Sequence, residues 1–216
     1  MPDASITLAD PAQSKDLATL LSRARSIDDD AAVRLQARGA VLAAWVPVMS
    51  GETLLERVPT VLGMRALHLA GPAEVDLTVQ ASAMLDRLAR QEKTEGEIAL
   101  PPVEVRAAWA GVVPPASGWQ RAGAVGAEEI DAASREGMSA VEAALPANPG
   151  AAVLSTVRSR IWGTLDERGF VTGAAFGATV LGFNDDALGF TLFTSGPWSR
   201  LSNRNGHILA RSPAAL

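Results

Sequence analysis

Hydrophobic residues in the first half of the chain recur once at helical spacing and several times at strand spacing. After Asp10, apolar residues three and four apart predict a helix that ends at the acidic run 28–30. The segments 31–37 and 40–46 flank Gly39 and predict a β-hairpin. Other apolar segments predict three more strands and a short helix, at 53–58, 64–69, 76–79 and from Ser82 onwards.

The second half opens with a break in this pattern and then becomes helical. Four prolines between residues 101 and 118 predict a linker or a long surface crossing. Apolar residues on one face predict a helix over 127–145, and a second helix follows and ends at Gly169. The apolar runs 174–183 and 188–194 predict a second β-hairpin. The apolar faces of the two helices carry Ile130, Met138, Val141 and Leu145, and then Val153, Val157, Ile161 and Leu165.

This order of elements indicates an α+β protein. We expect an N-terminal lobe over residues 1–100, with a largely antiparallel sheet and flanking helices. A proline-rich crossing over 101–118 then leads to a C-terminal lobe over 119–216, made of a helix pair and a β-hairpin.

Composition excludes several classes of site. The 216 residues include no cysteine and two histidines, so thiolate metal sites, disulfides and thiol nucleophiles are excluded, and no metal or cofactor is expected. No apolar run is long enough to span a membrane, and the N-terminus is acidic and contains proline, unlike a signal peptide. We therefore expect a soluble cytoplasmic protein with no membrane partner.

Charge is unevenly distributed along the chain. The net charge of −5 argues against nucleic acid as a partner, because generic binding to phosphates requires excess lysine and arginine. Residues 1–149 contain 20 acidic and 13 basic side chains, whereas residues 150–216 contain four acidic and six basic ones, and no acid follows Asp186. Such complementary halves can attract each other within one chain or between two, so a homodimer is a plausible assembly.

A polar stretch near the C-terminus has the residue types of an anion-binding loop. Arginines supply charge and planar donors, asparagine supplies neutral hydrogen bonds, and tryptophan offers a flat surface. The alternative is a pair of surface turns, because glycine, proline and asparagine are the usual turn residues. The candidate ligand-binding residues are Trp198, Arg200, Asn203, Arg204 and His207.

Nucleophilic catalysis has weak support. His207 could act as a base for Ser195 or Ser199, but a triad needs an orienting acid and neither serine lies in a nucleophile-elbow motif. Catalysis is therefore not the favoured activity, and no catalytic residue is assigned.

Helix, turn, helix and hairpin over 127–194 follow the order of a winged helix. The second helix carries hydroxyl and guanidinium groups of the kind that contact phosphates and bases. The predicted wing is apolar with acids at its tip, which disfavours contact with phosphates. The candidate nucleic-acid-binding residues are Ser155, Arg158, Ser159 and Arg160.

The segments AAVRLQARGAVLAAWV and DLTVQASAMLDRLA, followed by a PP…GW stretch before an acidic helix start, resemble a family of uncharacterised actinobacterial proteins of about this length. The resemblance covers most of the chain and implies no assigned function or site. The sequence as a whole favours a non-enzymatic interaction or regulatory protein. A winged-helix-like nucleic-acid binder, and a small enzyme or anion-binding protein using the C-terminal loop, are the alternatives.

Overall fold

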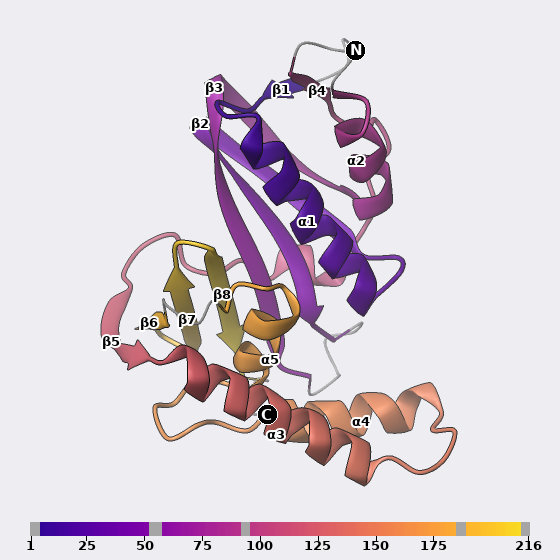
Figure 1. The fold of residues 1–216 in the computed structure, drawn as a ribbon, viewed down its shortest axis with the longest axis vertical. Helices are drawn as coiled ribbons and strands as arrows, with labels where there is room; N and C mark the ends of the chain where they lie inside the picture. The colour runs from indigo at the N-terminus through magenta and orange to yellow at the C-terminus, as the bar shows by residue number, and fades with distance from the viewer. Residues whose placement is uncertain (1–4, 52–57, 92–95, 185–188, 213–216) are drawn as a thin grey trace. The chain divides into compact units, whose positions relative to one another are not determined.

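The computed structural model describes residues 5–51, 58–91, 96–184 and 189–212. Helices and antiparallel strands make an α+β fold, which confirms the predicted class (Figure 1). The chain divides into two compact units, residues 1–47 with 64–110 and residues 48–63 with 111–216. The long strands β2 (Ala32–Met49) and β3 (Thr60–Gln80) each contribute residues to both units. The strand predicted at 53–58 lies outside the described residues, which resume at Val58.

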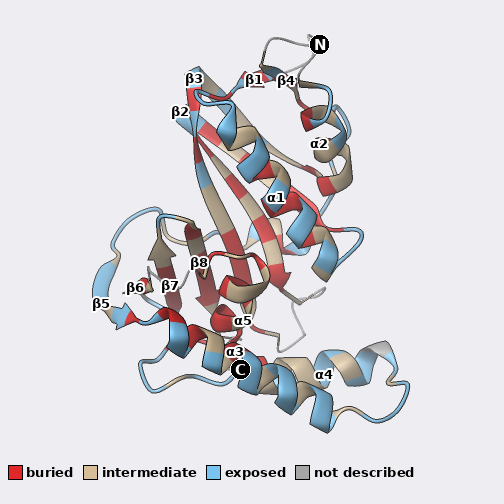
Figure 2. Cartoon of the chain, viewed as in Figure 1, coloured by how far each residue is buried: buried red, intermediate tan, exposed pale blue. Residues whose placement is uncertain are grey.

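The first unit packs two helices, α1 (Ala12–Ile27) and α2 (Ala81–Leu88), against each other. Helix α1 begins where expected, because the Asp10 carboxylate accepts a hydrogen bond from the Ala12 N–H at 2.8 Å. A small antiparallel pair, β1 (Ser5–Thr7) with β4 (Glu97–Ala99), and a 3-10 helix (Ala108–Gly111) complete this unit. One stripe of α1 is buried, as the helical spacing predicts (Figure 2): Leu17, Leu20, Leu21 and Ala24.

Strand β2 runs unbroken through Gly39, so the hairpin predicted at this glycine is wrong. Between Val33 and Val48, the buried residues occupy odd positions before Gly39 and even positions after it, and Gly39 has a φ of +64°. One residue in a left-handed conformation that changes the phase of a strand is typical of a β-bulge. The strands predicted at 64–69 and 76–79 likewise belong to the single strand β3.

The second unit is built on an antiparallel sheet. Its strands β5 (Gln120–Val125), β6 (Phe190–Ser195), β7 (Trp198–Asn203) and β8 (Gly206–Arg211) lie side by side in chain order, and β3 pairs with β8. Strand β5 therefore forms one edge of the sheet.

Three helices belong to the second unit: α3 (Ala127–Ala144), α4 (Ala151–Trp162) and α5 (Gly173–Val180). Helix α3 begins as expected, and the Glu129 carboxylate accepts a hydrogen bond from the Gly126 N–H at 3.1 Å. Helix α4 ends at Trp162, seven residues before the predicted Gly169, which instead takes φ +83° in the following turn. No helix in the described ranges has the length and apolar character needed to cross a membrane.

The hairpin predicted over 174–194 is also wrong, because its first half is helix α5. This helix consists mainly of glycine and alanine, and a short apolar run does not distinguish a buried helix from a buried strand. Small residues let α5 lie close to the sheet: a Cβ placed on Gly177 would be 3.5 Å from Ile208 of β8. The second predicted strand is β6, which pairs with β5 and β7.

Candidate ligand-binding site around Arg200

The register of the sheet places Arg200 on the face opposite α5. Ile208 faces α5, and Leu201 lies beside Ile208 on the neighbouring strand. Successive side chains of a strand point to opposite faces. Arg200, one residue before Leu201, therefore shares the other face with its two register partners, Phe193 and Leu209.

The guanidinium of Arg200 lies between two aromatic rings. Its carbon Cζ is 4.6 Å from the ring centroid of Trp119 and 4.5 Å from that of Phe193. The Trp119 indole N–H donates a hydrogen bond to the Pro115 carbonyl oxygen at 2.9 Å, which fixes the ring. Contact with two aromatic rings restricts how the planar guanidinium can rotate. Its N–H groups, which lie in that plane, therefore point in a defined direction.

Arg200 has no acidic partner among the residues that the structure describes. Its Nε atom is buried and makes no hydrogen bond, and burial lowers the pKa of the guanidinium from its ordinary value. An arginine nevertheless stays protonated at neutral pH. The guanidinium is only partly buried, and an anion that reaches it would gain a charge-assisted hydrogen-bond partner.

His207 lies near Arg200 on the same face. Burial, and then the positive charge of Arg200, lower the pKa of His207 from 6.5 to about 4. Its Nδ1 is 2.9 Å from the Ser202 hydroxyl, in the position across from it on β7. At neutral pH the imidazole is therefore uncharged, and it can offer a neutral hydrogen bond but no second positive charge.

Neither serine considered as a nucleophile is bonded to His207. Ser199 is buried, and its hydroxyl donates to the Ala210 carbonyl oxygen at 3.4 Å. Ser195 lies at the end of β6, opposite Trp198. The histidine is bonded to a different serine, so the arrangement offers no activated nucleophile.

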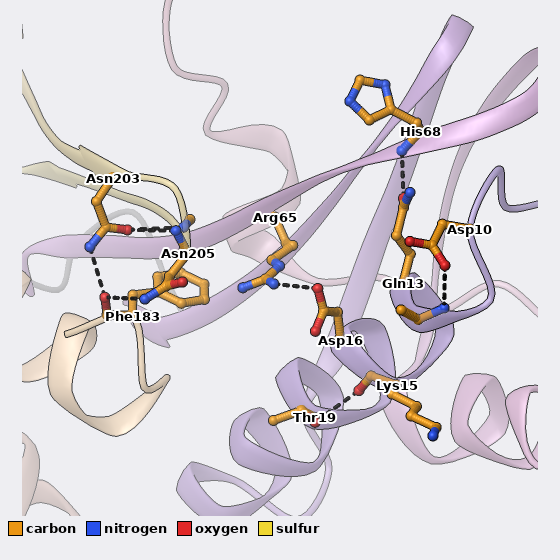
Figure 3. Close-up of polar contacts among 12 residues, drawn as sticks. Asp10, Gln13, Lys15, Asp16, Thr19, Arg65, His68, Phe183, Asn203 and Asn205 are labelled. Atoms are coloured by element: carbon orange, nitrogen blue, oxygen red, sulfur yellow. Dashed lines mark hydrogen bonds and ion pairs between the residues drawn. The ribbon is translucent and has the colours of Figure 1, made fainter. Parts of the chain in front are cut away.

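The other three predicted ligand-binding residues are a buried tryptophan and two residues of a turn. Trp198 shares the face of Arg200 but is only 5% exposed. Arg204 is exposed in the turn between β7 and β8. Asn203 holds that turn together: its Oδ1 accepts from the N–H groups of Asn205 and Gly206, and its Nδ2 donates to the Phe183 carbonyl at 2.8 Å (Figure 3). The structure thus brings Arg200 and His207 together and separates them from the turn residues.

Trp119 and Phe193 are the two residues that the sequence did not assign to this site. Trp119 directly follows the predicted proline-rich crossing over 101–118, and Phe193 lies in the predicted strand 188–194, whose neighbours the sequence does not give. Their meeting depends on the β6 and β7 register and on the chain path from Pro115 into β5. Only the presence of an aromatic ring close to two prolines could have drawn attention to Trp119.

The predicted nucleic-acid-binding residues lie on α4 and do not form one surface. Ser155 and Arg160 are exposed, whereas Arg158 and Ser159 are half-buried. The Ser159 hydroxyl donates to the Ser155 carbonyl at 2.7 Å, a bond within the helix. Ser155, Arg158 and Ser159 have the spacing of neighbours on one helix face, whereas Arg160, two residues after Arg158, lies on another side of the helix. The helix in place of the expected wing removes the element order that suggested this function.

The described residues contain no group of three histidine, aspartate or glutamate side chains placed to hold a metal ion. The arrangement around Arg200 combines one cation next to two aromatic rings with one neutral imidazole.

Comparison with known proteins gives two family matches. Residues 1–111 match the family described as "Domain of unknown function (DUF8010)", and residues 114–215 match "Domain of unknown function (DUF8185)". No curated protein matches the chain.

The chain is similar to several solved structures. Caulobacter crescentus pol III beta is 10% identical with a TM-score of 0.50, over 99% of this chain and 66% of that one. The DNA polymerase sliding clamp from Pseudomonas aeruginosa, solved with a ligand, is 10% identical with a TM-score of 0.48, over 98% of this chain and 64% of that one. The chain thus spans less than two thirds of these proteins, and the likeness concerns the fold alone.

Proposed function

The chain belongs to the family described as Domain of unknown function (DUF8010), and from that premise we propose that it is a non-enzymatic interaction protein that binds a carboxylate group of a partner protein through Arg200. The fold resembles that of Caulobacter crescentus pol III beta. Because one fold can serve many functions, the proposal depends on the site.

The observation that carries the proposal is the arginine held between Trp119 and Phe193 with its Nε unpaired. A carboxylate matches a guanidinium with two parallel hydrogen bonds, and the flanking rings supply apolar contact for the rest of a peptide. The neutral His207 adds a hydrogen bond without activating a nucleophile, so binding rather than catalysis is the chemistry that this site favours.

Isothermal titration with a short glutamate-rich peptide tests this function, with inorganic phosphate as a second probe. We expect saturable binding of the peptide by the parent protein and loss of that binding in Arg200→Gln. Arg204→Gln is the matched control, because Arg204 is exposed in the adjacent turn. Equal binding by Arg200→Gln, or no saturable heat with the parent, contradicts the proposal. Binding of phosphate but not of the peptide assigns the site to a free anion instead.

Nucleic acid is a second candidate partner because of the similarity in fold. The net charge of −5 argues against it, but the fold is shared with a subunit of a DNA polymerase. Salt-dependent binding to a DNA duplex decides the question, since phosphate contacts give a steep dependence on salt concentration. The cytoplasmic location and the absence of a cofactor stay predictions from composition.

A further inference from the structure

The apolar stripe of α3 is covered along only part of its length. Ile130 and Ser134 are fully buried, whereas Met138, one turn further, is 41% exposed. Val141 and Leu145 continue the stripe and are half-buried. The sequence predicts that this whole stripe is buried, but burial decreases along α3 towards its C-terminal end (Figure 2).

Helix α4 buries little of its own apolar surface. Among its residues with described side chains, only Trp162, at its C-terminal end, is buried, and Val153 in its first turn is 44% exposed. Leu154, Val157 and Ile161 are half-buried. An isolated helix of 12 residues is marginal in water, so α4 depends on packing that the chain itself supplies only in part.

We call the incompletely buried apolar residues of the two helices the hairpin strip: Met138, Val141, Leu145, Val153, Leu154 and Val157. The two helices pack on each other within the second unit. Apolar side chains left incompletely buried on two packed helices, with charged residues nearby, are typical of an interaction site.

The two helices carry net charges of opposite sign. Helix α3 carries five acidic residues and one arginine, whereas α4 carries two arginines and no acid. No ion pair among the described residues joins Glu136 or Glu142 of α3 to Arg158 or Arg160 of α4. Glu136 and Glu142 line one hollow on α3 together with Met138 and a single basic residue, Arg135. This surface fits a partner that is apolar and basic, and α4 of a second copy has both properties.

We propose that the α3–α4 pair is a self-association surface, on which α3 of one copy lies against α4 of the other. Two-fold symmetry then forms each contact twice, so the acidic helix meets the basic helix at both ends. Apolar burial of the hairpin strip provides the attraction, and the paired charges set the orientation.

Analytical ultracentrifugation of two complementary charge variants tests the proposal. The first variant combines Glu136→Lys with Glu142→Lys, and the second combines Arg158→Glu with Arg160→Glu. Each variant alone places like charges in both contacts, so we expect it to be monomeric where the parent dimerises. Mixing the two variants restores opposite charges in both contacts, and we expect a heterodimer.

A second pair of variants tests the apolar part without relying on charge. Met138→Asp should weaken self-association at least about tenfold, as for a central interface residue. Leu165→Asp is the matched control, because Leu165 is 60% exposed and lies outside the α3–α4 pair. A parent protein that is monomeric at every concentration overturns the proposal, as does a parent-like dimer of either charge variant or of Met138→Asp. Arg200→Gln should dimerise like the parent, which separates this surface from the carboxylate site.

Discussion

Gly137 of α3 and Trp162 of α4 lie in direct contact, with the indole ring close to the backbone of the glycine. A Cβ at position 137 would lie 2.1 Å from ring atom Cζ3 of Trp162, far inside van der Waals contact. The ring is 2% exposed and also stacks on Phe176 of α5 at a centroid separation of 4.8 Å. The three helices of the second unit therefore meet at one tryptophan, and the absence of a side chain at Gly137 makes room for it.

Replacing Gly137 with alanine should destabilise the protein. Alanine favours a helix by about 1 kcal/mol over glycine, but an overpacked core costs about 1–3 kcal/mol, and here the added atom would displace a buried ring. Urea unfolding followed by tryptophan fluorescence measures the net effect. Gly71→Ala is the control, because nothing lies within 4 Å of its Cβ. A Gly137→Ala variant as stable as the parent would show that the Trp162 ring moves aside freely.

The sequence predicted α1 and α3 well and failed at α5 and β2. The long helices repeat apolar residues over several turns, and a periodic signal of that length has few alternatives. Helix α5 is eight residues of mostly glycine and alanine, too short and too uniformly apolar to show its period. In β2, Gly39 indicated a turn, but the strand continues through this residue despite its positive φ. The predicted boundary at 101–118 stays a prediction.

The candidate ligand-binding residues stay a prediction, and only their placement in the fold can be compared with the sequence. Residue chemistry alone drew attention to Arg200 and His207, because a cation and an imidazole stand out in a segment without acids. It also drew attention to Asn203 and Arg204, which lie in or at the β7–β8 turn. The aromatic partners Trp119 and Phe193 could not be predicted, since strand register and the path of the chain after Pro115 bring them to Arg200.

Asn203→Ala should destabilise the second unit. The side chain accepts from two N–H groups of the β7–β8 turn and donates to the carbonyl oxygens of Phe183 and Gly189. Losing these bonds leaves partly buried groups without partners, which costs about 1–3 kcal/mol. Thermal unfolding measures the loss, and Arg204→Ala in the same turn provides the comparison. Equal melting temperatures for the two variants would show that the turn forms without the asparagine.

Stability at acid pH should depend on the ion pair between Arg34 and Asp76. Two guanidinium nitrogens of Arg34 donate to the two Asp76 oxygens at 2.8 Å, and this bonding lowers the pKa of Asp76 below its ordinary 3.8. A carboxyl with a depressed pKa stabilises the fold above 3.8 and loses that contribution as the pH falls through its folded value. Urea unfolding at descending pH measures this effect. As the pH falls below 3.8, the free energy of unfolding should decrease less for Asp76→Asn than for the parent. The same slope in both proteins would contradict this role.

His207 should produce a separate loss of stability at higher pH. Its pKa is about 4 in the folded chain and 6.5 as the ordinary value, so between these values the unfolded chain binds a proton that the folded chain does not. The contribution of His207 to the free energy of unfolding is therefore fully present above pH 6.5. It is lost as the pH decreases towards 4, by up to about 3 kcal/mol. Urea unfolding across this window should lose most of its pH dependence in His207→Gln. An unchanged dependence would place the responsible group elsewhere.

Arg200→Gln should raise the pKa of His207 without restoring it to 6.5. Burial is the larger cause of the depression and the charge of Arg200 the smaller one, so removing the charge leaves the larger cause in place. NMR titration of the His207 ring protons measures the shift, with Arg204→Gln as the control for a neighbouring arginine in the exposed turn. A pKa that does not move would mean that the guanidinium and the imidazole are electrostatically independent. A full return to 6.5 would mean that the variant has opened the face of the sheet to water, because only rehydration removes the cost of charging a buried imidazole.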